Sequence, residues 1–230
     1  GFGALYKIDQ TSWTSTVVAN SGWAFGIAAN KSGDIFYSND TVIGRYNITT
    51  GISSVFHDGA TFYDDLSIDP FGYIFAAALG SCALDIIDPS GGLVQRVSTG
   101  HCADGVAYGG GNVFQNNIDG TITKLSFSGN NYTGTVTSTE IAIGGGYGDL
   151  ASVGPDGAFY VTNYGAILPD GSIDSSALIR IALKSGDQGF GDGSVPTETV
   201  PEPGSLALLG LGLAGFLDRL RKKRGKRSGF

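Results

Sequence analysis

The chain has 230 residues and a formal net charge of −7, with 41% apolar and 11% aromatic residues. This composition is typical of a globular protein and excludes a disordered chain. Residues 1 to 200 hold seven Lys and Arg against nineteen Asp and Glu, a net charge of −12. Such an acidic body repels phosphate backbones, so we expect no nucleic-acid partner.

Thirty-eight glycines, together with many Val, Ile, Tyr, Phe and Thr residues, indicate short strands joined by tight turns. The chain is therefore predicted to be all-β. It contains no Met, and residues 1 to 9 already have the pattern of a folded strand. We expect a start codon, a secretion signal and further parts of the fold to lie upstream.

A repeat of about forty residues runs through the body of the chain. One repeated element is a short strand that ends in a polar residue, at residues 5–9, 43–47, 84–88, 122–126 and 178–182. Between its copies lies a second unit: a short apolar strand, a turn glycine and a strand rich in aromatic residues. The second unit gives inner strands at residues 26–29, 65–68, 105–108 and 149–153, with turn glycines Gly33, Gly72, Gly111 and Gly157.

The period of this repeat predicts a β-propeller. Ile27, Leu66, Val106 and Leu150 hold the same place in successive units and are 39, 40 and 44 residues apart. Four short strands per period are typical of a propeller blade. A β-sandwich would also give short strands, but it would not repeat the same residue classes at one period.

The repeat resembles the NHL-repeat and gluconolactonase-like group of propellers over residues 4 to 184. The sequence contains four full blades and an N-terminal half blade at residues 4–20, which supplies only a third and a fourth strand. Either this pair closes a ring whose remaining strands lie upstream, or the natural ring has more blades. The predicted domains are a propeller body at 1–184, a flexible linker at 185–199 and a tail at 200–230.

Cys82 and Cys102 are the two cysteines of the chain. In a reducing cytosol they would be buried thiols, whereas an exported body favours a disulfide. Cys82 lies between the second and third strands of one blade, and Cys102 lies in the loop before the next blade. These two kinds of loop open on the same face of a propeller, so the repeat permits the disulfide.

The same face is predicted to gather acidic and amide side chains. The acidic residues stand at the starts of inner strands, and the amides follow the turn glycines; they are Asp64, Asp65, Asp104, Asp149, Asn39, Asn117 and Asn163. Such oxygens can hold Ca²⁺, as they do in the gluconolactonase-like relatives. The alternative is that they only form turns by bonding their own backbone, and this interpretation is favoured. No cofactor is firmly predicted.

His57 and His101 are the only histidines, and neither has a second ligand at metal spacing. Both are predicted to be loop residues rather than catalysts. Chemistry of the streptogramin-lyase kind would need a histidine on this face, and His101 is the candidate for it.

The last thirty residues form three consecutive blocks. Pro201, Glu202 and Pro203 come first, an apolar Gly-rich segment follows at 204–217, and residues 219–227 carry seven of the fourteen Lys and Arg. The apolar side chains of the segment include Leu206, Leu209, Leu213, Phe216 and Leu217. The basic end includes Arg219, Arg221, Lys222, Lys223 and Arg224. Residues 206–217 are shorter than the roughly 17 residues that span a bilayer unaided, and snorkelling of the basic side chains extends their reach.

These blocks resemble the PEP-CTERM sorting signal of Gram-negative bacteria. The resemblance implies a transmembrane helix with a cytoplasmic basic stop, and processing by an exosortase at the motif. It also implies a transient stage at the inner membrane, followed by location on the cell surface or outside the cell.

Two functions follow from these expectations. The first is an exported, non-catalytic propeller that binds an unidentified partner at the surface or in the extracellular matrix. The alternative is a metal-dependent hydrolase or lactonase of the gluconolactonase-like kind. The sequence favours the first because it shows no convergent set of acid and base residues.

Overall fold

The computed structural model describes residues 3–129, 131–143, 147–154, 156–165 and 177–181. The chain divides into two compact units, residues 1–7 with 15–193 and residues 8–14 with 194–230. The predicted linker and sorting tail lie outside the described residues. Within the described part of the chain, no helix is long and apolar enough to cross a membrane.

The described residues of the first unit form β-sheets, which confirms the predicted all-β class. A two-stranded sheet joins β1 (Leu5–Ile8) and β2 (Ser15–Ala19). Blade 1 has the strands β3 (Ile27–Ala29), β4 (Asp34–Asn39), β5 (Val42–Asn47) and β6 (Ile52–Asp58). Blade 2 has the strands β7 (Leu66–Ile68), β8 (Ile74–Ala78), β9 (Ala83–Ile87) and β10 (Leu93–Val97).

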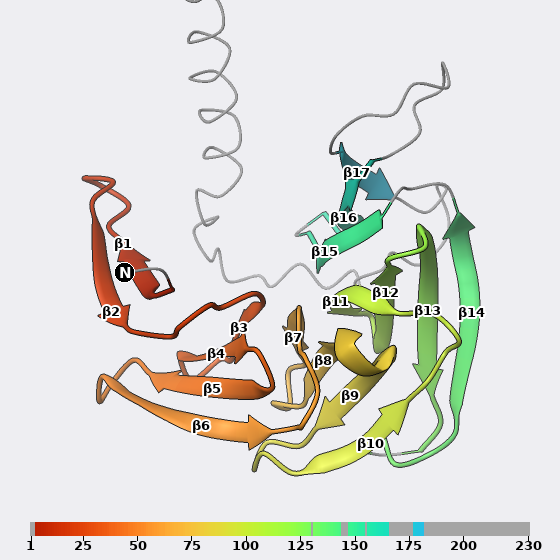
Figure 1. The fold of residues 1–230 in the computed structure, drawn as a ribbon, viewed down its shortest axis with the longest axis horizontal. Coiled ribbons are helices and arrows are strands. Elements are labelled where there is room, and N and C mark those ends of the chain that lie inside the picture. Colours follow the sequence, from red (N-terminus) through yellow and green to blue (C-terminus); the bar gives the residue numbers. More distant parts are fainter. Residues whose placement is uncertain (1–2, 130, 144–146, 155, 166–176, 182–230) are drawn as a thin grey trace, which may run out of the picture. The chain divides into compact units, whose positions relative to one another are not determined.

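Blade 3 has the strands β11 (Ala103–Gly109), β12 (Asn112–Asn117), β13 (Thr121–Phe127) and β14 (Val136–Ile143). Blade 4 has the strands β15 (Tyr147–Val153), β16 (Phe159–Tyr164) and β17 (Ala177–Ile181) among the described residues. Each strand of a blade pairs antiparallel with the next strand along the chain. Figure 1 shows the blades following one another in chain order.

This arrangement confirms the predicted propeller. The inner strands β3, β7, β11 and β15 fall on the four predicted segments, and each contacts the inner strand of the next blade. The N-terminal sheet contains only two strands, as the half blade predicted. The turn glycines are also confirmed, because Gly33, Gly72, Gly111 and Gly157 all adopt a φ between +69° and +93°, a region that favours glycine.

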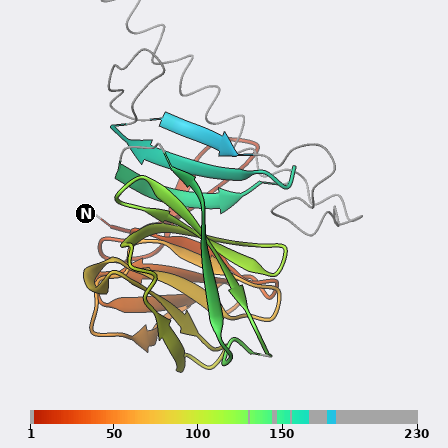
Figure 2. The ribbon, with the colours of Figure 1, turned by 90° about the vertical axis from the view of Figure 1, so that its right-hand side faces the viewer.

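Successive sheets lie face to face (Figure 2). Apolar side chains form a layer between each pair of sheets. One layer joins blades 1 and 2 around Ile43 and Leu66, and the next joins blades 2 and 3 around Phe75 and Val113. Because blade 2 is covered on both faces, every residue of β8 and β9 is buried. Similar layers join blade 3 to blade 4 and the β1–β2 sheet to blade 1.

The inner strands of neighbouring blades approach one another so closely that two positions have no room for a Cβ atom. A Cβ on Gly26 would lie 2.6 Å from the carbonyl oxygen of Asp64, and a Cβ on Gly105 would collide with the carbonyl oxygen of Asp149. This close approach allows hydrogen bonds to cross from one blade to the next.

Side chains at one position of the repeat make these crossing bonds. In blade 1, the Ser38 hydroxyl donates to the carbonyl oxygen of Asp64 over 2.8 Å. In blade 3, Asn116 Nδ2 donates to the carbonyl oxygen of Asp149 over 3.0 Å. The equivalent residue of blade 2 is Ala77, whose methyl group cannot donate.

Asp65, which directly precedes β7 in the same blade, compensates for the hydrogen bond to the next blade that Ala77 cannot make. Its Oδ2 accepts the backbone N–H of Val106 on β11 at 2.9 Å and that of Ala151 on β15 at 3.2 Å, and its Oδ1 accepts the N–H of Leu66 at 2.8 Å. Blades 2, 3 and 4 therefore meet at one carboxylate, which we call the Asp65 bridge. The neighbouring Ser67 accepts the N–H of Tyr108 in the same way.

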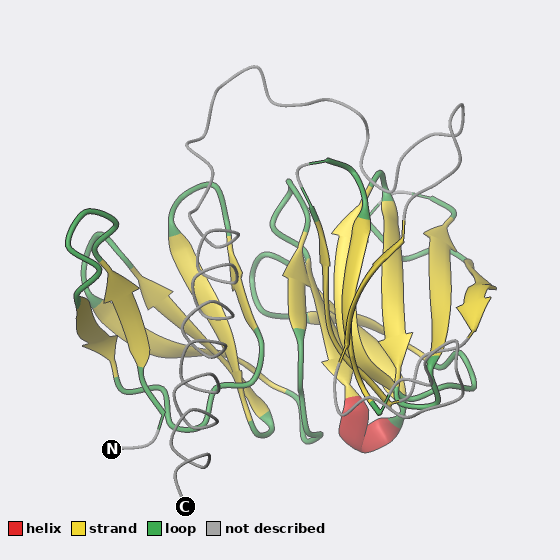
Figure 3. Cartoon of the chain, turned by 90° about the horizontal axis from the view of Figure 1, so that it is seen from above, coloured by secondary structure: helices red, strands yellow, loops and turns green. Residues whose placement is uncertain are grey.

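Cys82 and Cys102 form the predicted disulfide. A one-turn 3₁₀ helix, η1 (Leu79–Ser81), precedes Cys82 between β8 and β9, and Figure 3 shows this helix at one end of the strands. Cys102 lies between β10 and β11. The bond therefore ties blade 2 to the connection that enters blade 3.

Removing this disulfide with Cys82→Ala and Cys102→Ala should lower the free energy of unfolding by about 3 kcal/mol, because the bond closes a 20-residue loop. Urea unfolding of the oxidised wild type and the double variant measures the difference. Wild type reduced with a dithiol is the matched control and should fall to the stability of the variant. Equal stability of all three proteins would contradict a stabilising role.

Asp65→Asn should destabilise the fold by about 1–3 kcal/mol, because an amide offers one acceptor oxygen and turns its NH₂ group toward backbone N–H donors. Asp58→Asn on the exposed end of β6 is the control and should leave the melting temperature unchanged. If both variants melt like the wild type, the Asp65 bridge does not hold the blades together.

Candidate functional site

The face that carries the Cys82–Cys102 disulfide also carries a group of three carboxylates. Asp64 directly precedes β7, Asp104 lies on β11, and Asp149 lies on β15. One carboxylate oxygen from each residue lies within 4.8 Å of the other two. The propeller thus brings together three acidic residues that are separated by 40 and 45 residues in the sequence.

Burial and the neighbouring acids hold a proton in this group. Burial raises the pKa of Asp104 to about 8, and its hydrogen bond with Asp64 and the negative charges of Asp64 and Asp149 act in the same direction. Near neutral pH, Asp104 therefore carries a proton. Among the described residues, Asp104 Oδ1 is buried without a hydrogen-bond partner. The group can accept a cation in exchange for its proton.

Asp65, the fourth predicted acidic residue, has a different environment. Its carboxylate is buried at 6% exposure and faces the three backbone N–H groups of the Asp65 bridge. Burial raises its pKa to about 7, and the three N–H donors act in the opposite direction. The residue is therefore placed to support the fold between the blades, beside the other three carboxylates.

The predicted amide residues make structural hydrogen bonds. Asn39 Nδ2 donates to the carbonyl oxygen of Ser21, and Asn117 Nδ2 donates to the hydroxyls of Thr121 and Thr123. Asn163 Oδ1 accepts from Asn116 Nδ2 over 3.3 Å. These amides therefore bind backbone and side-chain groups of the strands and loops that support the face.

The two histidines differ from each other. His101 lies in the loop before β11, as predicted, and its Nδ1 is 2.6 Å from Asp119 Oδ2. The prediction for His57 was wrong, because this residue lies on β6 and is buried at 9% exposure. Its sequence context includes the β-branched Val55 and the aromatic Phe56, residue types that favour strands, and this was the signal that could have placed it.

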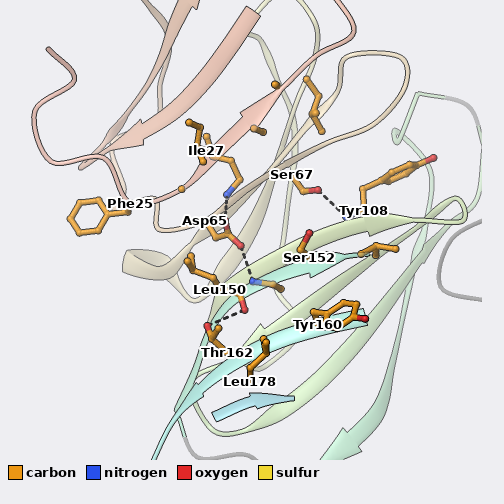
Figure 4. A pocket seen from close by; sticks show the side chains of 17 residues that line it. Phe25, Ile27, Asp65, Ser67, Tyr108, Leu150, Ser152, Tyr160, Thr162 and Leu178 are labelled. Carbon is orange, nitrogen blue, oxygen red and sulfur yellow. Dashed lines mark hydrogen bonds between the residues drawn. The ribbon is translucent and has the colours of Figure 1, made fainter. Parts of the chain in front are cut away.

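A cavity of about 460 Å³ lies between the inner strands of blades 1, 2 and 4. Its lining includes the apolar side chains of Phe25, Ile27, Leu150 and Leu178, which are between 40% and 59% exposed. Figure 4 shows Asp65 among these residues, with a hydrogen bond to β15. Ser67 and Ser152 add hydroxyl groups to the wall. The cavity therefore exposes apolar side chains beside several polar groups.

Comparison with known proteins finds a sequence match for the tail and structural likenesses for the body. Residues 199–222 match the PEP-CTERM protein-sorting motif. No curated protein matches the sequence.

The described body is similar in structure to several propellers. Streptogramin B lyase matches with 17% identity and a TM-score of 0.52, over 72% of this chain and 56% of the lyase. A Thermus protein described as a putative glucose dehydrogenase matches with 16% identity and a TM-score of 0.57, over 76% of this chain and 74% of that protein. A luciferin-regenerating enzyme matches with 11% identity and a TM-score of 0.56, over 77% of this chain and 69% of the enzyme.

These likenesses show the fold alone, and the chain spans little more than half of the lyase. The sorting motif implies exosortase-dependent export to the surface or the extracellular space. The chain is therefore a β-propeller protein with a C-terminal PEP-CTERM protein-sorting motif.

Proposed function

We propose that the protein is processed by an exosortase at Pro201, Glu202 and Pro203, after a stage at the inner membrane in which the apolar segment spans the bilayer. The mature propeller then serves at the cell surface or in the extracellular matrix as a non-catalytic scaffold that binds a partner. The match of residues 199–222 to the sorting motif carries this proposal. The disulfide supports it, because such bonds persist in oxidising compartments outside the cytosol.

The cavity between blades 1, 2 and 4 supports a binding role. Four large apolar side chains stay partly exposed around it, and a partner that covered them would remove this apolar surface from water. The histidine on the face, His101, is held by Asp119. Binding a partner requires no proton transfer by His101 or Asp119.

A second candidate function is a metal-dependent hydrolase or lactonase. The group of Asp64, Asp104 and Asp149 favours it, because hard cations such as Ca²⁺ prefer carboxylate oxygens. The three residues fit such an ion: each supplies one oxygen, and Asp104 Oδ1 lacks a partner among the described residues. A bound cation would polarise a substrate carbonyl. The body's structural neighbours include enzymes, namely a lyase and a luciferin-regenerating enzyme.

Changing the sorting motif should block processing and leave the propeller folded. In a host with an exosortase, replacing Pro201, Glu202 and Pro203 by Ala should leave the unprocessed precursor in the membrane fraction. Immunoblotting of cell fractions measures this, and the melting temperature of the purified protein reports on the fold.

Glu198→Ala is the matched control, because Glu198 lies just outside the matched residues 199–222. It should be processed like the wild type. Normal processing of the triple variant would contradict the proposed role of the motif, and loss of body folding would contradict the separation of body and tail.

The two candidate functions differ in their response to Ca²⁺. A hydrolase should gain thermal stability in millimolar Ca²⁺, more at pH 9 than at pH 6, because Asp104 holds a proton below about pH 8 that the cation must displace. Its lactone hydrolysis should require the metal and fall at least a hundredfold in Asp104→Ala or Asp149→Ala. Asp58→Asn is the control and should keep both responses. If the wild type shows neither a Ca²⁺-dependent rise in melting temperature nor lactone hydrolysis, the hydrolase is excluded and the scaffold remains.

A further inference from the structure

A second group of polar side chains, most of them buried, lies between blades 1 and 2. It contains His57 of β6, Tyr63 of the connection to blade 2, Asp85 of β9 and Arg96 of β10. Tyr63 and Asp85 are fully buried, and His57 is 9% exposed. The two functions considered above use none of these residues.

Two glycines allow these side chains to meet. A Cβ on Gly59 would collide with the Tyr63 hydroxyl, and a Cβ on Gly91 would collide with the carbonyl oxygen of Phe56. Gly91 also has a φ of +93°, which favours glycine. The turn of blade 2 that contains Gly91 can therefore approach β6 of blade 1 closely enough to bond His57.

The hydrogen bonds of Asp85 and Tyr63 have a defined direction. Arg96 binds Asp85 through both Nε and Nη2, each at 2.7 Å, so Asp85 is an ionised acceptor. The Tyr63 hydroxyl donates to Asp85 Oδ2 at 2.6 Å. Burial and the adjacent carboxylate raise the pKa of Tyr63, so the phenol keeps its proton. That single proton is used in the bond to Asp85.

Both nitrogens of His57 then face acceptors. Nδ1 lies 2.9 Å from the carbonyl oxygen of Gly91, which can only accept. Nε2 lies 3.2 Å from the Tyr63 hydroxyl oxygen, whose proton already points to Asp85. A neutral ring has one N–H, so it would leave one of these contacts as two opposed lone pairs. Only a ring with two N–H groups donates to both.

We propose that His57 carries a proton on both ring nitrogens and that the resulting cation joins blade 1 to blade 2 as a proton-dependent bridge, the His57 bridge. Through Tyr63 the cation is linked to the buried carboxylate of Asp85. The bridge exists in full only while the ring holds both protons. Because the sorting motif implies export, the bridge would respond to the pH outside the cytosol.

In the described elements around the ring, the other charged groups have partners of their own or are exposed. Arg45 on the adjacent strand β5 is paired with Asp34 at 2.7 Å, and Asp58, next to His57 on β6, is exposed. Asp88, in the turn with Gly91, accepts hydrogen bonds from Ser90 and Gly92. Asp85 and Arg96 are therefore the charged groups that lie directly across the bridge.

NMR of the full-length protein with ¹⁵N-labelled histidine tests the proposal. The chain has only two histidines, and His101→Asn leaves the His57 signals alone in the spectrum. At pH 7.5 the two-bond ¹H–¹⁵N pattern of His57 should show both nitrogens protonated. A pattern with one protonated nitrogen would overturn the proposal.

A pH titration and one variant test the bridge itself. Where His57 loses its second proton, the signals of the Gly91 amide and the Tyr63 ring should change over the same pH range; unchanged signals would refute a bridge between the blades. Tyr63→Phe removes the acceptor of Nε2, so its His57 should hold one proton at pH 7.5, while His101 keeps the wild-type pattern. A doubly protonated His57 in a folded Tyr63→Phe variant would also count against the proposal. The wild-type spectrum decides the protonation state even if this variant does not fold.

Discussion

The carboxylate of Asp65 accepts backbone N–H groups from the inner strands of three blades. The inner strand is the edge of its sheet, so its N–H groups would otherwise be buried between blades without a partner. Each unmet donor of this kind costs about 1–3 kcal/mol. The Asp65 bridge avoids this cost for one N–H group of β11 and one of β15. It lies in blade 2, where Ala77 cannot supply the side-chain donor that Ser38 supplies in blade 1 and Asn116 supplies in blade 3.

The arrangement of the candidate site depends on the same approach of the blades. Drawing β7, β11 and β15 together also brings Asp64, Asp104 and Asp149 within reach of one another. Like charges at this distance repel, and the proton of Asp104 relieves the repulsion. A cation or a cationic group on a partner would relieve it equally well. The charge of this face would therefore change with any cation that it bound, under either proposed function.

The contacts between blades show how far the repeats have diverged in chemistry while keeping one geometry. Blades 1 and 2 share the Ser38 hydroxyl bond and the His57 bridge, blades 2 and 3 share the Asp65 bridge and the disulfide, and blades 3 and 4 share the Asn116 amide. Apolar layers are common to all of them. The apolar layers therefore account for the repeated architecture, and the polar contacts distinguish one interface from the next.

The sequence alone determined the parts of this protein that depend on local pattern. The period of Ile27, Leu66, Val106 and Leu150 predicted the inner strands, because a strand and its turn are set by neighbouring residues. The disulfide was predicted from the export that the tail implies, and the places of its two cysteines in the repeat permitted it. The sorting motif was readable from residues 199–222 because three ordered blocks, rather than a folded surface, define it.

Only the tertiary structure decided which side chains act together. Asp64 and Asp65 are adjacent in the sequence, yet one joins the carboxylate group and the other faces backbone donors, because successive residues point in different directions at the start of a strand. His57 was assigned to a loop, and its strand position became clear only with its partners on blade 2. The partners of these side chains lie up to 86 residues away in the chain. No local pattern records such contacts, since they arise from the packing of whole blades.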